Sequence, residues 1–409
     1  MRHNLRVNGA RLQSRLERLA EAGARPDGGV NRLALTDADR DGRDLVVGWM
    51  RDLGLAVAID AVGNVVGLRA GREDGPPVMM GSHIDTVLTG GRYDGALGVM
   101  AGLEVIETLA EAGCVTRRPL AVAFFTNEEG ARFQPDMFGS LVFTGQLPLA
   151  AALATVGVDG ATAGEELRRI GYAGDAAVGR PEVHAYVELH VEQGPTLEAE
   201  GFVIGAVEGV QGISWTELTI SGQANHAGTT PMRMRHDAGY VAAEIATFAR
   251  RLAGEIGGHQ VATVGALTLT PNLVNVVPER AVMTVDLRNT DNAALKDAER
   301  RLTAFAAATA AAEGVTLESR TLARFDPVPF AAPLVARVEA IARELDLAVK
   351  RLPSGAGHDA QMLAAVCPAC MIFVPSAGGV SHNIAEYTAS DLCAAGADVL
   401  LRLVTELAE

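Results

Sequence analysis

Apolar runs and helical patterns alternate along the first half of the chain. Three short apolar runs, at 77–80, 120–126 and 185–191, have the length and composition of buried strands, and the first ends at Gly81. Residues 96–112 repeat apolar side chains at helical spacing. Strands that alternate with helices predict an α/β sandwich around a largely buried sheet.

The middle of the chain predicts four strands and two helices in the order strand-helix-strand-strand-helix-strand. Along the chain these segments are 215–221, 236–252, 261–270, 281–288, 292–312 and 316–324. This is the ferredoxin-like split order of an α+β domain. The proline-rich residues 325–329 are interpreted as a linker, after which the buried pattern resumes with a helix at 333–345, a strand at 371–374 and a helix at 390–407.

These patterns predict two domains, one of them discontinuous in sequence. A catalytic domain comprises 1–211 and 329–409, and an inserted domain at 212–328 interrupts it. The length of 409 residues is ample for two cores.

Composition limits the partners of this protein. The chain has 35 basic and 50 acidic residues, for a net charge of −15, which disfavours nucleic acid and anionic membranes as partners. No secretory signal or membrane-length apolar stretch is apparent, and four cysteines do not make a disulfide framework, so we expect a cytoplasmic protein. An anionic substrate would need a dedicated local cation.

Potential metal ligands lie at the ends of the predicted strands. His83 and Asp85 follow the first strand, and Asp94 lies in a glycine-flanked loop that opens a helix. Glu128 and Glu129 follow the second strand. Positions two apart on an extended chain face the same way. The Asp85 carboxylate can therefore reach one ring nitrogen of His83 and orient the ring, while the other nitrogen binds a metal.

Two further histidines complete this set. His190 lies at the end of the third strand, and His382 precedes the last helix. A lone histidine is more often a satisfied structural residue, and a Glu-Glu pair is usually a solvated helix end. Imidazoles and carboxylates gathered at strand ends instead favour a site for Zn²⁺, or for Mn²⁺, Co²⁺ or Ni²⁺.

These segments resemble the aminoacylase/carboxypeptidase superfamily of metallohydrolases and, within it, the hydantoinase/carbamoylase family. That family contains N-carbamoyl-L-amino-acid hydrolases, β-ureidopropionases and allantoate amidohydrolases. The resemblance covers essentially the whole chain, and His190 in His-Val-Glu-Gln-Gly marks the branch. It implies a metallopeptidase-like catalytic domain with a mixed central sheet flanked by helices, and an inserted ferredoxin-like lid domain that mediates dimerisation.

The resemblance also implies two divalent metal ions. Asp94 would bridge them, His83 and His190 would complete one site, and Glu129 and His382 the other. Glu128 would then be the general base.

The resemblance assigns substrate contacts to both domains. In the inserted domain it makes His226 the oxyanion-stabilising group of a neighbouring subunit in a homodimer, and it adds Asn275 and Arg288. The residues alone instead favour His226 as an inert turn residue. Arg288 could form an ion pair with Asp286 or Glu279 instead of holding a substrate carboxylate.

Three substrate contacts are expected in the catalytic domain. Gln193, Gly357 and His358 fill these positions in the resemblance, although His358 could also simply pack the loop. Cys367 and Cys370 match Cys-x-x-Cys, but they lead into a strand instead of a helix, so we interpret them as packing residues and not as a redox centre.

The predicted activity is therefore hydrolysis of the C–N bond of an N-carbamoyl carboxylate. The main prediction is conversion of an N-carbamoyl-L-amino acid to the L-amino acid, CO2 and ammonia. Allantoate or N-carbamoyl-β-alanine as the substrate is an alternative within the family, and an N-acyl-amino-acid deacylase or peptidase is a more distant one. A catalytically silent dimeric binding protein is the alternative from another functional class.

Overall fold

The computed structural model describes residues 5–179 and 182–409. The predicted segment 1–211 includes the six residues that lie outside this description. The chain divides into two compact units, which we call unit 1 (Met1–Glu208 and Phe330–Glu409) and unit 2 (Gly209–Pro329). The prediction places the two boundaries at 211/212 and 328/329.

A mixed sheet forms the centre of the fold of unit 1, although its residues 209–210 and 328–329 fall within the bounds of unit 2. Across the sheet the strands are β1 (Ala56–Ile59), β2 (Val65–Arg69), β4 (Leu120–Phe125), β3 (Val78–His83), β5 (Ala185–Val191), β15 (Ala369–Val374), β6 (Ile204–Val210) and β13 (Val328–Pro329), with β14 (Val349–Ser354) also paired to β6. Residues 328–329, predicted to be linker, are therefore a short strand beside β6.

The four central strands, β4, β3, β5 and β15, run parallel to one another. Every residue of these strands is buried, because helices cover the sheet on both faces, which explains their continuous apolar runs. Their carboxyl ends consequently meet at one edge of the sheet, where α/β proteins place their ligands.

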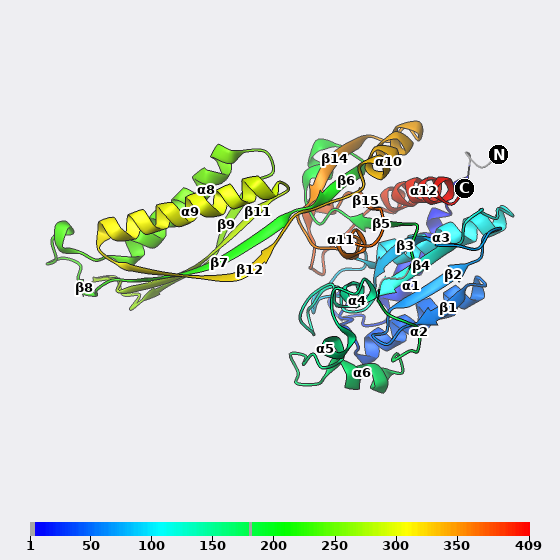
Figure 1. Ribbon diagram of the computed structural model, residues 1–409, viewed down its shortest axis with the longest axis horizontal. Coiled ribbons are helices and arrows are strands. Elements are labelled where there is room, and N and C mark those ends of the chain that lie inside the picture. Colours follow the sequence, from blue (N-terminus) through cyan, green and yellow to red (C-terminus); the bar gives the residue numbers. More distant parts are fainter. Residues whose placement is uncertain (1–4, 180–181) are drawn as a thin grey trace. The chain divides into compact units, whose positions relative to one another are not determined.

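Helices flank the sheet of unit 1 (Figure 1). They are α1 (Gly9–Ala20), α2 (Asp37–Asp52), α3 (Ala96–Glu111), α4 (Phe138–Phe143), α5 (Leu149–Leu153), α6 (Ala163–Ile170), α7 (Thr196–Glu200), α10 (Ala332–Glu344), α11 (Asp359–Leu363) and α12 (Ser390–Leu407), with a 3-10 turn, η3 (Ala377–Gly379). Among the described residues, no helix combines the length and apolar character needed to cross a membrane.

Unit 2 has a four-stranded antiparallel sheet with two long helices on one face (Figure 1). Across this sheet the strands are β12 (Thr316–Phe325), β7 (Gly212–Ser221), β11 (Arg280–Asn289) and β9 (Val261–Thr270). The helices are α8 (Ala238–Ile256) and α9 (Asn292–Glu313), and Asp237 and Asp291 cap their first turns. The order β7-α8-β9-β11-α9-β12 is the strand and helix order that the sequence predicts.

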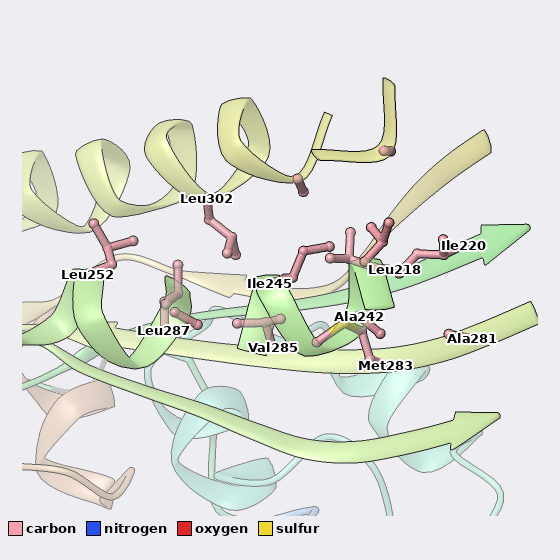
Figure 2. Close-up of a cluster of buried hydrophobic side chains, with 14 of the residues drawn as sticks. Leu218, Ile220, Ala242, Ile245, Leu252, Ala281, Met283, Val285, Leu287 and Leu302 are labelled. Atoms are coloured by element: carbon pink, nitrogen blue, oxygen red, sulfur yellow. The ribbon is translucent and has the colours of Figure 1, made fainter. Parts of the chain in front are cut away.

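The core of unit 2 follows from alternation in the strands and helical spacing in the helices. On β11, Met283, Val285 and Leu287 point toward the helices, and Ile245 of α8 and Leu302 of α9 meet them (Figure 2). The intervening residues of β11 are only partly buried, so they form the opposite face of the sheet.

Beyond one end of this sheet the chain forms a small tip. It contains β8 (Asn225–His226), the 3-10 turn η2 (Met232–Met234) and β10 (Val276–Val277), and β8 pairs with β10.

Candidate metal centre and substrate residues

The parallel strands of unit 1 bring the predicted ligands together at one edge of the sheet. His83 is the last residue of β3, and His190 is the last but one of β5. Glu128 and Glu129 follow β4, and His382 lies in the segment between β15 and α12. Sequence segments nearly 300 residues apart thus meet at one site.

Asp94 lies at the centre of this cluster. Its Oδ1 is 3.2 Å from Nε2 of His190 and 3.7 Å from Nε2 of His83. Its Oδ2 is 3.3 Å from Nε2 of His382, which is itself 3.2 Å from Oε2 of Glu129. Two groups of potential metal ligands therefore share Asp94: His83–Asp94–His190 and Asp94–Glu129–His382.

The donors of this cluster fit a cation. Nδ1 of His83 lies 3.0 Å from the main-chain carbonyl of Asp85, and Nδ1 of His190 lies 2.9 Å from that of Val191. Because a carbonyl only accepts, each Nδ1 carries the hydrogen, and the neutral ring then presents the lone pair of Nε2. Nε2 of His190 also accepts the N–H of Gly95 at 3.2 Å. Both Nε2 atoms lie next to an oxygen of Asp94, which is itself an acceptor, so a positive ion between these groups would be stabilised by all three.

The electrostatics of the cluster point the same way. Burial opposes protonation of His83 and His190, but Glu128 and Asp94 face them and raise their pKa values. Hydrogen bonds to Asp94 and Glu129 raise the pKa of His382 to about 10. Burial opposes ionisation of Asp94, yet the three imidazoles hold its pKa well below the usual range. The site therefore favours ionised carboxylates that surround positive charge.

Glu128 differs from Glu129 in its surroundings. It is buried, with Oε2 3.4 Å from Nε2 of His83, and burial raises its pKa well above the usual range. A carboxyl group with a raised pKa beside potential metal ligands has the properties of a proton carrier near neutral pH.

Asp85 orients the cluster in a different way from the one predicted. Its carboxylate is 3.9 Å from Nδ1 of His83, and its main-chain carbonyl takes that hydrogen bond instead. The carboxylate accepts the backbone N–H groups of Glu128 (3.2 Å) and Glu129 (3.3 Å). Asp85 therefore fixes the loop that carries both glutamates.

Unusual backbone conformations build the site. Asn127, Gln193 and His382 all have φ between 52° and 58°, in the left-handed region that non-glycine residues rarely adopt. Gly95 has φ 63°, and a Cβ there would collide with the ring of His83. Such residues gather at functional sites, where the surrounding structure holds them in place.

Gln193 contacts the cluster directly. Its Nε2 donates to Oδ2 of Asp94 at 2.9 Å and to Oγ of Ser381 at 3.1 Å. Its backbone N–H donates to Oγ of Ser376.

His358 lies next to His190 and is buried. The two rings meet edge to face with centroids 4.5 Å apart, and Nε2 of His358 is 2.8 Å from Oγ of Ser354. Burial lowers the pKa of His358 well below its usual value, so the ring is neutral. Gly357, directly before it, is partly exposed at the start of α11.

Glu188, His190 and His358 also come close enough to hold an ion. However, the Glu188 carboxylate already accepts the hydroxyl of Ser82 (2.6 Å) and the N–H of Ala360 (2.8 Å). We therefore interpret Glu188 and His358 as side chains that surround His190 and not as ligands of a further ion.

His226 lies on the exposed tip of unit 2. Its Nδ1 accepts the N–H groups of Gly228 (3.0 Å) and Thr229 (3.3 Å), so the ring hydrogen is on Nε2. Asn275 is adjacent, because its carbonyl accepts the N–H of Ala227 at 2.9 Å. The turn thus presents an exposed imidazole N–H donor.

Arg288 lies at the other end of the unit 2 sheet. It forms an ion pair with Asp286, with Nη2 2.9 Å from Oδ2, as one interpretation of the sequence expects. The two side chains project from the same face of β11, two residues apart.

Two buried supports of the site carry no sequence signal that would have identified them. Oε1 of Glu386 accepts the N–H groups of Tyr93 and Asp94 at 3.0 and 3.1 Å, so it holds the loop of the central carboxylate. Nε of Arg32 donates to the carbonyl of Ile84, between His83 and Asp85, at 2.6 Å. Neither residue belongs to a local motif, and only the tertiary structure brings them to the site.

The two cysteines of the Cys-x-x-Cys motif are buried and free. Burial raises the pKa of the Cys367 thiol to about 12, and the Cys370 thiol shifts in the same direction. Thiols of this kind are poor nucleophiles, which agrees with a packing role.

Comparisons with known proteins give a consistent picture. The sequence model of Peptidase family M20/M25/M40 matches residues 79–406. The chain is 44% identical to the N-carbamoyl-L-amino-acid amidohydrolase of Rhizobium meliloti (99% of this chain and 98% of that protein). It is 42% identical to the N-carbamoyl-L-amino acid amidohydrolase of Geobacillus stearothermophilus (98% and 99%).

A solved structure agrees over the same extent. The crystal structure of a hydantoinase/carbamoylase family amidase from Burkholderia multivorans matches with a TM-score of 0.97 at 44% identity, covering 99% of this chain and 98% of that one.

Proposed function

Since the chain belongs to the M20/M25/M40 peptidase family and, within it, to the hydantoinase/carbamoylase family, we propose that it hydrolyses N-carbamoyl-L-amino acids to L-amino acids, CO2 and ammonia. Membership of this family already makes the chain a metal-dependent amidohydrolase, whatever its substrate. The relatives at 42–44% identity support this choice of substrate. The pair of ligand groups that share Asp94, with Glu128 beside them, supports the hydrolytic chemistry.

We assign two divalent ions, Zn²⁺ or Mn²⁺, Co²⁺ or Ni²⁺, to these two groups. His83 and His190 would hold one ion, Glu129 and His382 would hold the other, and Asp94 would contribute to both sites. When bound, such a pair polarises the substrate carbonyl and makes a nearby water more acidic.

The chain's own groups then carry the protons and the charge. Glu128, buried with Oε2 3.4 Å from Nε2 of His83, takes a proton from the attacking water and delivers it to the departing nitrogen. The N–H of His226 stabilises the developing oxyanion, a contribution commonly worth about 2.7–4 kcal/mol. The released carbamate decomposes to CO2 and ammonia.

Substrate recognition is assigned to residues of both units. Arg288 holds the substrate carboxylate, and Asn275, which lies beside His226 at the tip, contacts the substrate together with His226. Gln193, Gly357 and His358 act in unit 1, where Gln193 contacts Asp94 directly.

A homodimer is part of the proposal, and the geometry of unit 2 supports it. The tip begins next to Arg280, at one end of β11. Arg288 lies eight residues further along this strand, so roughly 26 Å separates Arg288 from the tip that carries His226. A small substrate cannot span that distance, so both residues act on one substrate only if they come from two copies. The edge strand β9, with Val261 and Leu267 about half exposed, offers a surface for such pairing.

The test is ammonia release by the purified protein loaded with Mn²⁺ or Zn²⁺. The substrates are N-carbamoyl-L-amino acids, N-carbamoyl-β-alanine, allantoate and N-acetyl amino acids, the last followed by amine release. Metal-dependent turnover of an N-carbamoyl-L-amino acid above the others supports the proposal. Preference for allantoate or N-carbamoyl-β-alanine assigns another ureido substrate, and turnover of only the acetyl compounds refutes a carbamoylase.

A further inference from the structure

The sheet of unit 2 has an open face around Arg288. Asp286 and Arg288 project from this face, since the intervening Leu287 is in the core on the other side. Trp215 of β7 lies directly opposite Asp286 in the strand register, and its side chain is 40% exposed. This exposed aromatic ring beside a half-buried arginine offers an apolar surface next to a cation, which suits a ligand that has both an apolar group and an anionic group.

Asp286 and Trp215 both contact the guanidinium of Arg288. Nε donates to both oxygens of Asp286, at 3.2 and 3.0 Å, and Nη2 donates to Oδ2 at 2.9 Å. The guanidinium carbon lies 5.8 Å from the centre of the Trp215 ring, within the range of a cation–π contact. These contacts hold the guanidinium in one orientation and surround it with an aromatic surface and a negative charge.

We propose that Trp215 and Asp286 determine which side chain the substrate carries: Trp215 contacts an apolar or aromatic side chain, and Asp286 disfavours a second carboxylate. The inference rests on the proposed role of Arg288. In an α-amino acid the side chain and the carboxylate share one carbon, so a carboxylate bound to Arg288 places the side chain within reach of the Trp215 ring. The same geometry would bring an acidic side chain toward Asp286, where like charges repel.

The substrate class is therefore N-carbamoyl derivatives of apolar and aromatic L-amino acids, in preference to N-carbamoyl-L-aspartate. N-Carbamoylglycine is the matched reference substrate, because it has the carboxylate but no side chain. The ratio of kcat/KM between a substrate with a side chain and N-carbamoylglycine then isolates the side-chain contact from the carboxylate contact.

The kinetic test measures this ratio with N-carbamoyl-L-phenylalanine in the Mn²⁺-loaded wild type and in Trp215→Ala. Aromatic contacts of this kind correspond to a fall of roughly 3- to 10-fold in the ratio. The control variant is Arg320→Ala, which removes another arginine from the same face, paired with Glu217 and roughly 13 Å along the sheet. The Arg320→Ala control should leave the ratio unchanged. If Trp215→Ala instead lowers kcat/KM equally for both substrates, Trp215 only supports Arg288, and the proposal is overturned.

The Asp286→Asn variant tests the effect of the Asp286 charge on acidic substrates. Asp286→Asn should raise kcat/KM for N-carbamoyl-L-aspartate relative to N-carbamoylglycine by about tenfold. An unchanged ratio overturns the role of Asp286. The Arg288→Ala variant separates this inference from the proposed function: an unchanged KM for both N-carbamoylglycine and N-carbamoyl-L-phenylalanine would mean that Arg288 does not bind the carboxylate at all.

A binding measurement keeps the inference testable if Trp215→Ala does not fold. The chain contains two tryptophans, Trp49 and Trp215, so Trp49→Phe leaves Trp215 as the single emitter. Titration of this variant with N-carbamoyl-L-phenylalanine should change the tryptophan emission, and N-carbamoylglycine should change it far less. Identical responses to the two compounds would show that the side chain does not reach Trp215.

Discussion

Mixing two impaired variants, His226→Ala and Arg288→Ala, tests whether one active site uses residues of two copies of this chain. Each variant alone lacks one group at every site. Loss of an oxyanion donor lowers kcat by roughly 10²–10³-fold, and loss of the Arg288 fork raises KM for carboxylated substrates.

The expected recovery follows from the distance within unit 2. Because roughly 26 Å separates Arg288 from the His226 tip, each site takes these two residues from different copies. In a mixed dimer one site then has both native residues and the other site has neither. Random exchange of equal amounts produces half mixed dimers, so activity should recover to about a quarter of the wild-type value.

The assay is ammonia release from an N-carbamoyl-L-amino acid at low substrate concentration, after subunit exchange. Tagged copies and native mass spectrometry establish that mixed dimers have formed. A mixture of Arg288→Ala with Gln193→Ala shows which copy supplies Arg288 to a given unit 1. Recovery of activity means that Gln193 and Arg288 at one site belong to different copies, and no recovery means that they belong to the same copy. If confirmed mixed dimers of His226→Ala and Arg288→Ala show no more activity than the separate variants, the two-copy site is refuted.

Three further predictions address the centre and its surroundings. Glu128→Gln should keep its metal content, measured by elemental analysis, and lose about 10²–10⁴-fold in turnover; full activity would remove Glu128 from proton transfer. Gly95→Ala should lose metal, because the added Cβ collides with the ring of His83. Mn²⁺ at 100 to 1,000 times Kd should stabilise the wild type against thermal unfolding by about 2.7–4.1 kcal/mol, and this stabilisation should disappear in the variant. Retained stabilisation would contradict this geometry. Burial raises the pKa of Asp60 to about 6, above its unfolded value of about 3.9, so its ionisation costs the folded state up to roughly 3 kcal/mol. The wild type should therefore lose stability as the pH rises from about 4 to 6, and denaturant unfolding of Asp60→Asn should lack that component, whereas equal slopes would show that Asp60 does not titrate in this range.

Local pattern was sufficient for most of the long elements. Residues 185–191, 261–270 and 390–407 form the elements that their periodicity predicts, with the same bounds. The sequence analysis did not predict β1, β2, β14 and the helices α4–α7, which are only four to eight residues long, nor the 16-residue α2. The strand at 328–329 was mistaken for linker because its pairing with β6 is not local.

The sequence by itself determined which residue types are available for chemistry and which strand ends they follow. His83, Glu128 and His190 could be placed beside strand ends because buried parallel strands have a recognisable composition. The grouping of ligands around the two oxygens of Asp94 depends on strands β4, β3, β5 and β15 being neighbours, which is a property of the sheet order and not of any local segment.

The tertiary structure alone decided how these groups are held. The support that Glu386 gives the Asp94 loop and the hydrogen bond from Gln193 to Asp94 join segments far apart in the sequence. The carbonyls that fix the tautomers of His83 and His190 are only two and one residues away, but the backbone conformation that aims them is visible only in the folded chain. The same is true of Trp215, which becomes a neighbour of Asp286 and Arg288 only when β7 pairs with β11. Hydrogen bonds and packing act over a few ångströms, so their partners are set by the folded chain and not by separation along the sequence.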